Sequence, residues 1–206
     1  MTRRGSPIAS AGMVRSVLPF VLALLAIQVQ AQTLLDAKCT GKADVPWSEQ
    51  IAGCTTAIDS GKFVGKDLAK AFVSRGNAYA QTGDLDRSLA DIEQAIRLDP
   101  DNAFAVGARG DLHLVKKDYA RAIADYTAVI AIDPGNAPAF IGRAIARYAT
   151  GDLDPAIADC DQAIRLQPTL ADALYWRGMA KRRKGDAAAG DADIAAARKI
   201  DPGIGR

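Results

Sequence analysis

A proline recurs every 34 residues, at Pro100, Pro134, Pro168 and Pro202. A constant period in the range of about 20 to 50 residues is typical of proteins built from stacked copies of one supersecondary unit. Each proline follows a run of residues with helical hydrophobic spacing, of which residues 88–99 are the first. The period therefore predicts a repeated helical unit that ends in a proline-marked turn.

Two shorter signals recur with the same spacing inside each unit. An arginine followed by a small residue stands in the first half of the unit: Arg75-Gly76, Arg109-Gly110, Arg143-Ala144 and Arg177-Gly178. A turn pair comes next: Gly83-Asp84, Lys117-Asp118, Gly151-Asp152 and Gly185-Asp186. Glycine ends helices and aspartate caps the next helix, so each unit is predicted to contain a helix, a tight turn, a second helix and the proline turn.

The pattern resembles the tetratricopeptide repeat family over residues 69–202. The resemblance rests on Tyr79, on the closing prolines and on small residues where helices cross: Gly76, Gly110, Ala144, Gly178, Ala95, Ala163 and Ala197. It implies an all-α fold, an α-solenoid of about four helix-turn-helix units in a right-handed superhelix with an N-terminal capping segment. The repeat domain is expected at residues 67–206, with units at 69–102, 103–136, 137–170 and 171–204.

Some residues depart from the family pattern, and we expect local differences in packing there. The departures are His113, Arg147 and Lys181 at the position of Tyr79, Val129 at a small-residue position, and Lys117 at a turn glycine.

Residues 1–31 have the three parts of a secretory signal peptide. Basic residues precede an apolar run at residues 17–29, and a small residue, Ala31, marks the expected cleavage point. The apolar run is short for a membrane-spanning helix, which needs about 20 apolar residues. An uncleaved anchor is the open alternative. We expect export to the periplasm or the medium, with no membrane span after cleavage.

Removal of the signal changes the charge of the chain. The signal holds three of the 26 basic residues and none of the 24 acidic ones, so the mature chain has a net charge of −1. The apparent basicity of the full chain is therefore no evidence for a nucleic acid partner, and none is predicted.

Residues 32–66 are predicted to form an N-terminal cap with one helix near residues 48–59. We expect a disulfide between Cys39 and Cys54 that fastens this segment over the open end of the stack, as export would allow. The alternative of a redox-active pair is disfavoured because neither cysteine belongs to a Cys-x-x-Cys motif. Cys160 is expected to be a buried, inert thiol.

The four arginines of the repeat allow two interpretations. They could form a ladder for an anionic ligand, or each could pair with the aspartate sixteen residues later: Asp91, Asp125, Asp159 and Asp193. The pairing is favoured because two antiparallel helices of one unit would bring the partners together. The only histidine, His113, is expected to pack in the core. The basic run at residues 181–184 is either a solvated helix end or an anchor for an acidic peptide tail.

By the same resemblance, the first helix of each unit lines a concave groove. Helical spacing places thirteen residues along it: Val73, Asn77, Phe104, Asp111, Leu114, Ile141, Ile145, Tyr148, Tyr175, Trp176, Met179, Arg182 and Arg183. Apolar anchors beside a basic end would suit a peptide or helix with a hydrophobic face and an acidic terminus. Tyr148 and Trp176 could instead fill gaps between helices.

The sequence thus predicts a non-catalytic protein-interaction scaffold, an adaptor or assembly factor whose partner is a protein or peptide. Three cysteines and one histidine leave little material for a zinc site or a histidine-based catalytic dyad, so no catalytic residue, metal or cofactor is predicted. The alternative is a self-assembly module, a weak homo-oligomer that stacks through an alanine-rich C-terminal face. That face could also cap itself.

Overall fold

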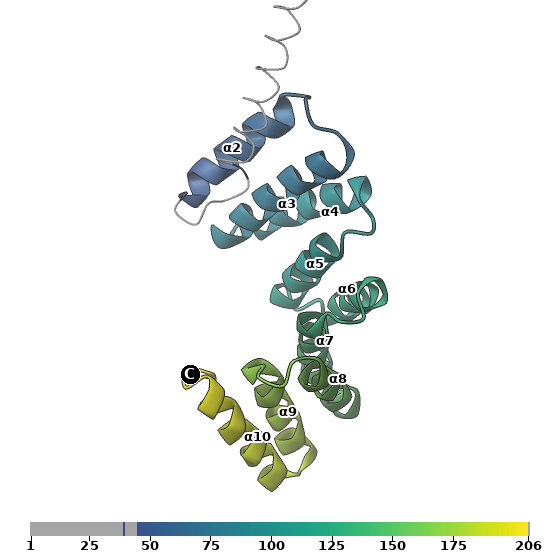
Figure 1. Cartoon of the computed structure of the whole chain (residues 1–206), viewed down its shortest axis with the longest axis vertical. Coiled ribbons are helices and arrows are strands. Elements are labelled where there is room, and N and C mark those ends of the chain that lie inside the picture. The colour runs from purple at the N-terminus through teal and green to yellow at the C-terminus, as the bar shows by residue number, and fades with distance from the viewer. Residues whose placement is uncertain (1–38, 40–44, 206) are drawn as a thin grey trace, which may run out of the picture.

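The computed structural model describes Cys39 and residues 45–205, and the predicted signal peptide lies outside them. Figure 1 shows a curved stack of helices in chain order along the longest axis. The helices are α2 (Trp47–Asp59), α3 (Gly65–Gln81), α4 (Leu85–Leu98), α5 (Ala103–Val115), α6 (Tyr119–Ile132), α7 (Ala137–Thr150), α8 (Leu153–Leu166), α9 (Ala171–Lys184) and α10 (Ala187–Ile200). The described part contains no strand.

The helices pack as consecutive pairs. α3 packs on α4, α5 on α6, α7 on α8 and α9 on α10, and each pair also contacts the next along the chain. α2 packs on α3 at the N-terminal end of the stack. The α-solenoid predicted from the 34-residue period is therefore confirmed. Its core is a chain of small apolar clusters shared between neighbouring pairs, as expected when one helix pair cannot bury its apolar face alone.

The turn residues act largely as the sequence indicates. Asp84, Asp118 and Asp186 each accept a hydrogen bond from the backbone N–H three residues later, whereas Asp152 makes no such cap. Lys117 adopts a positive φ of 59° where the other units place a glycine. Lys117 therefore adopts a left-handed backbone conformation, which costs a residue other than glycine about 1 kcal/mol.

The first helices of the two middle units have caps that the sequence analysis did not identify. Asn102 accepts from the N–H of Ala105, and Asn136 accepts from the N–H of Ala139. Both asparagines lie two residues after a closing proline, so the proline turn delivers a cap to the next unit.

The predicted arginine–aspartate pairs are present in all four units. In each unit the arginine Nε and Nη2 atoms donate to the two carboxylate oxygens at 2.6 to 3.0 Å: Arg75 to Asp91, Arg109 to Asp125, Arg143 to Asp159 and Arg177 to Asp193. All four aspartates are buried. Such forked pairs satisfy both carboxylate oxygens at once, which a buried charge requires.

The pair in the last unit shows how these contacts affect the pKa of the buried aspartate. Burial raises the pKa of Asp193, but the hydrogen bonds from Arg177 and Lys181 lower it more, so its pKa lies below the usual value. Lys181 stands at the position of Tyr79 in the first unit, and Arg147 likewise adds a second cation to Asp159 at 2.7 Å. The departures from the family pattern at this position therefore strengthen the ion pairs.

Three of the four arginines also reach the helix that precedes their unit. The Nη1 atom of Arg75 donates to Thr55, that of Arg143 to Thr127, and that of Arg177 to Asp161. Arg75 thereby ties its unit to the cap helix α2, and Arg143 and Arg177 tie theirs to the second helix of the unit before.

Neighbouring units are complementary in side-chain size. The core residue of one second helix meets a residue sixteen positions later in the next first helix: Ile92 with Ala108, Tyr126 with Gly142, and Cys160 with Trp176. At each of these interfaces a large side chain faces a smaller one. A Cβ atom at Gly142 would lie only 2.4 Å from the Tyr126 ring.

We predict that Gly142→Ala lowers the free energy of unfolding by about 1 to 3 kcal/mol, because the added methyl group overlaps the Tyr126 ring, which already packs against Gly110. Adding Tyr126→Ile restores the isoleucine–alanine combination of the preceding interface and should recover most of this loss. Urea unfolding followed by circular dichroism measures both variants.

Gly107→Ala is the matched control for this test. Its Cβ would make an ordinary contact of 3.7 Å with Val129, so the variant should be neutral or slightly stabilised. If the two substitutions, Gly142→Ala and Tyr126→Ile, lower the free energy of unfolding additively in the double variant, the proposed size complementarity is contradicted.

Candidate functional site

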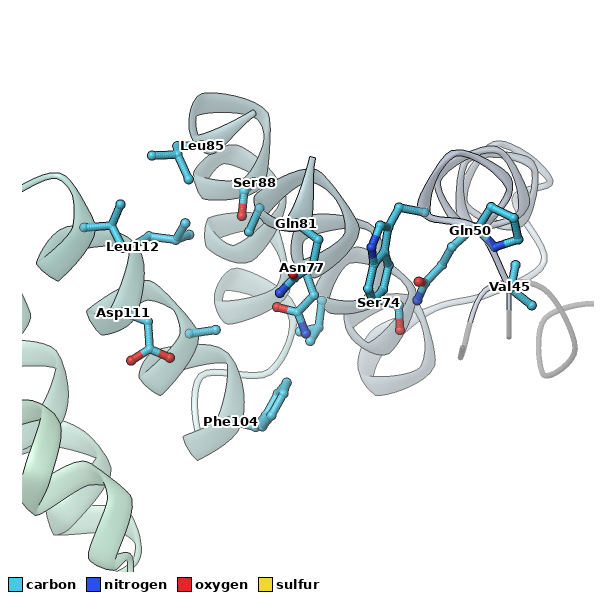
Figure 2. A pocket seen from close by; sticks show the side chains of 16 residues that line it. Val45, Gln50, Ser74, Asn77, Gln81, Leu85, Ser88, Phe104, Asp111 and Leu112 are labelled. Carbon is cyan, nitrogen blue, oxygen red and sulfur yellow. The ribbon is translucent and has the colours of Figure 1, made fainter. Parts of the chain in front are cut away.

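A cleft of about 1120 Å³ opens between the N-terminal cap and the first two helix pairs. Figure 2 shows the side chains that line it, which come from the start of α2, from α3, from the start of α4 and from α5. It is larger than two other cavities among the described residues, which hold about 350 and 500 Å³.

One wall of the cleft is a single stripe of α5. Phe104, Ala108, Asp111 and Val115 follow one another at spacings of four, three and four residues, which puts them on one face of the helix. Phe104 is 66 % exposed and Val115 is 61 % exposed, although both are large and apolar. This wall therefore offers apolar groups at both ends of the helix and a carboxylate between them.

The wall on α3 has a different character. Ser74, Asn77 and Gln81 line it with uncharged polar groups, above the buried Val73. None of the hydrogen bonds between described residues uses the side-chain amides of Asn77 and Gln81. At the base of the cleft the Ser88 hydroxyl is buried and has no hydrogen-bond partner in the described part of the chain. This wall can therefore donate and accept hydrogen bonds.

The cap supplies the third wall through Val45, Pro46, Trp47 and Gln50. The predicted disulfide between Cys39 and Cys54 is confirmed: it joins two buried cysteines whose Cα atoms are 4.5 Å apart. Gln50 also donates to the carbonyl oxygen of Cys39 at 3.1 Å. The disulfide thus holds the helix whose first residues line the cleft.

A smaller cavity of about 350 Å³ continues the cleft toward the third unit. It shares Asn77, Phe104 and Asp111 with the larger one. Here the Tyr126 hydroxyl donates to Asp111 Oδ1 at 2.6 Å. Desolvation raises the pKa of Asp111, and the hydrogen bond from Tyr126 opposes that rise. Burial and the same hydrogen bond raise the pKa of Tyr126 above its usual value.

The groove residues predicted for the first two units fall into two groups. Val73, Asn77, Phe104 and Asp111 all line the cleft. Leu114 instead packs against the apolar cluster around Tyr126.

The groove residues predicted for the third and fourth units pack mainly against one another. Ile141 is 8 % exposed and belongs to an apolar cluster of the core, against which Ile145 packs. Trp176 makes edge-to-face contacts with Tyr148 and Tyr175, with ring centroids 5.5 and 5.6 Å apart.

These contacts agree with the second interpretation given above, in which Tyr148 and Trp176 fill gaps between helices. Trp176 occupies the space beside the small Cys160. Met179 is half-buried on the same helix.

The basic run at the end of α9 is engaged within the chain. Arg183 stacks over the Tyr148 ring and donates to the Tyr148 carbonyl oxygen. Arg182 lies 3.5 Å from Asp191, and Lys184 pairs with Asp154. An anionic ligand at this helix end would have to compete with these contacts.

The C-terminal residues cover part of α9. Ile204 is buried, and a Cβ atom at Gly205 would lie 2.5 Å from the Tyr175 ring. The turn at residues 201–205 therefore packs on Tyr175, which the sequence analysis assigned to the groove.

Two further expectations concern buried reactive groups. His113 is buried with Nε2 3.9 Å from Asp125 Oδ2, which fits its predicted packing role. Burial raises the pKa of the Cys160 thiol to about 12, so it is protonated and inert at neutral pH. No group of three metal-ligating side chains occurs among the residues with defined placement. No helix in that part is long and apolar enough to cross a membrane.

Sequence reasoning missed the cleft residues outside the repeat pattern. Trp47 and Gln50 lie in the cap, for which no repeat position exists. Val115 continues the spacing of Phe104 and Asp111 and could have been found from it.

We predict that the double variant Cys39→Ala/Cys54→Ala lowers the free energy of unfolding by about 3 kcal/mol, because the disulfide closes a loop of 15 residues. Chemical denaturation with and without a reducing agent measures the effect. The reducing agent should destabilise only the natural chain. If the reducing agent lowered the free energy of unfolding of the double variant by the same amount, the disulfide would not be the cause.

Comparisons with known proteins agree with this architecture. Two family models described as tetratricopeptide repeat match residues 73–137 and 113–182, which together exceed half of the chain. A search of curated proteins by sequence found no match.

Three solved structures illustrate the likeness in fold. The crystal structure of MamA protein is 16% identical, with a TM-score of 0.71, over 84% of this chain and 92% of that one. MamA from Desulfovibrio magneticus RS-1 is 20% identical, with a TM-score of 0.70, over 87% of this chain and 95% of that one.

The third is YrrB, described as a TPR protein with an unusual peptide-binding site. It is 18% identical, with a TM-score of 0.63, over 77% of this chain and 79% of that one. The period, the helix pairs and the matching models lead to one conclusion: the chain belongs to the tetratricopeptide repeat family.

Proposed function

We propose that this chain is a non-catalytic scaffold that binds a segment of a partner protein in the cleft between the cap, α3 and α5. The observation that carries the proposal is the set of large apolar side chains exposed on the cleft lining. Trp47, Phe104 and Val115 are between 47 % and 66 % exposed, and all three line the cleft. Exposed apolar groups gathered around one concavity are typical of interaction sites.

The polar groups of the cleft support a peptide as the occupant. An extended segment carries unpaired backbone N–H and C=O groups at every residue. The amides of Asn77 and Gln81 and the buried Ser88 hydroxyl lie in the same cleft and are without partners in the described structure. A bound backbone would supply partners to these groups, which makes binding more favourable than burial of a purely apolar ligand.

The volume of the cleft also favours a peptide segment. About 1120 Å³ lies at the upper end of the range for small-molecule sites, and the cleft continues into the second cavity along α5 and α7. The peptide-binding site named for YrrB occurs on the same fold.

The cellular setting is part of the proposal. The disulfide between two buried cysteines is typical of proteins in oxidising compartments, and the expected signal peptide would deliver the chain there. We place the scaffold in the periplasm or the medium, where it would act as an adaptor or assembly factor.

The described groups of the cleft support a scaffold without catalysis. Asp111, the one carboxylate among the described lining residues, is hydrogen-bonded to Tyr126, and His113, the chain's only histidine, lies outside the cleft lining. The lining that the structure describes therefore holds no hydrogen-bonded pair of nucleophile and base.

The test begins with random dodecapeptides displayed on phage and selected against the purified chain. We predict that Phe104→Ala weakens the selected peptides by about tenfold or more, since a large apolar contact is lost. Fluorescence anisotropy measures the affinity.

Ile132→Ala, which removes a similarly exposed apolar residue from α6, is the matched control and should leave affinity unchanged. Failure to select any peptide, or equal losses in the two variants, would overturn the proposal.

A further inference from the structure

We infer that the cleft selects a cationic side chain, lysine or arginine, in an otherwise apolar segment and pairs it with Asp111. This inference rests on the proposed function and specifies the chemistry of its partner. It differs from the expectation of a partner with an acidic terminus, because the basic groups behind that expectation are engaged within the chain.

Asp111 differs in charge from the rest of the cleft lining. Among the sixteen lining residues that the structure describes, it is the only one with a charged side chain. The contact that the described residues give its carboxylate is the hydrogen bond from the Tyr126 hydroxyl to Oδ1, and the ion pairs of the described chain do not include it. The four aspartates of the arginine ladder are all paired, so Asp111 stands apart from them.

Tyr126 fixes the orientation of the Asp111 carboxylate. Tyr126 is clamped between Gly110 and Gly142, where a Cβ atom would lie 3.0 and 2.4 Å from its ring. Its hydroxyl therefore reaches Asp111 from a fixed position and holds the carboxylate. Figure 2 shows Asp111 on α5, on the side of the cleft across from Asn77 and Gln81 on α3. The second carboxylate oxygen is left for a ligand.

The position of Asp111 in the repeat also sets it apart. Asp111 is the second unit's member of a series spaced by 34 residues, with Asn77 before it and Ile145 and Met179 after it. The series provides one anion, beside an amide and two apolar residues. A partner that runs across successive units would therefore meet a single negative charge in a mainly uncharged groove.

The electrostatics of Asp111 also favour a cation. Desolvation raises its pKa more than the hydrogen bond from Tyr126 lowers it, so that one hydrogen bond compensates the charged form only in part. A lysine or arginine that enters the cleft would supply an opposite charge to the carboxylate.

The α5 stripe sets the spacing of the two anchors. Phe104 and Asp111 are seven residues apart, or about 10 Å along a helix. An extended peptide advances about 3.3 Å per residue, so an apolar side chain at Phe104 and a cation at Asp111 should stand about three residues apart. Trp47, on the opposite rim, offers a further apolar contact.

The experiment is a charge-swap selection with the same random dodecapeptide library. The natural chain should enrich lysine or arginine about three residues from a large apolar residue. Asp111→Lys should instead enrich aspartate or glutamate at that place. Asp111→Asn should bind a selected lysine peptide about tenfold more weakly, yet bind its lysine-to-glutamine version as well as the natural chain does.

Tyr126→Phe serves as the matched control. It keeps the carboxylate and removes only the hydroxyl that holds it, so the preference for a cation should persist in reduced form. Circular dichroism confirms that each variant is folded.

The outcomes separate this inference from the proposed function. Peptides that depend on Phe104 but show no preference for charge would overturn the inference and keep the function. Failure of every chain to select a peptide would overturn both.

Discussion

The forked pair between an arginine of the first helix and a buried aspartate of the second determines how each unit is built. An ionised carboxylate in the core is tolerated only when both oxygens are satisfied, so the two helices must meet in one register. The remaining nitrogen of Arg75, Arg143 and Arg177 bonds to the helix that precedes the unit, which carries that register along the stack. The pairs occupy one face of the first helices and leave another face to line a cleft.

Tyr126 connects this scaffold to the cleft. It belongs to a second helix, yet its ring passes between two first helices at Gly110 and Gly142 and its hydroxyl emerges at Asp111. The other interfaces have a smaller second-helix residue, Ile92 or Cys160, and none of these can carry a polar group through the layer. The same size match that packs the second and third units therefore fixes a functional side chain. The cap performs the corresponding task on the other side, because its disulfide positions the wall at Trp47 and Gln50.

Much of the fold was predictable from the sequence because it depends on residue identity at constant spacing. The arginine–aspartate pairs and the aspartate caps are of this kind, whereas the disulfide was expected from the two cysteines of the cap and the expected export. The groove was predictable only in part. Asn77 and Asp111 follow from helical spacing, whereas Trp47 lies in a segment without a repeat position. The third and fourth units depart from the predicted groove because their side chains pack against one another. Trp176 fills the space beside Cys160, and Arg183 stacks on Tyr148. Contacts of this kind depend on three-dimensional packing that a one-dimensional pattern does not contain.

The most direct test of the account is photocrosslinking inside cells that make the chain. The photoreactive residue benzoylphenylalanine is placed at position 104, on the cleft, and in a second strain at position 132, an exposed site on α6. The account predicts a crosslinked partner protein from position 104 and none from position 132. Crosslinks of equal strength from both positions, or a dimer of the chain as the sole product from position 104, would contradict the claim that the cleft is the binding surface.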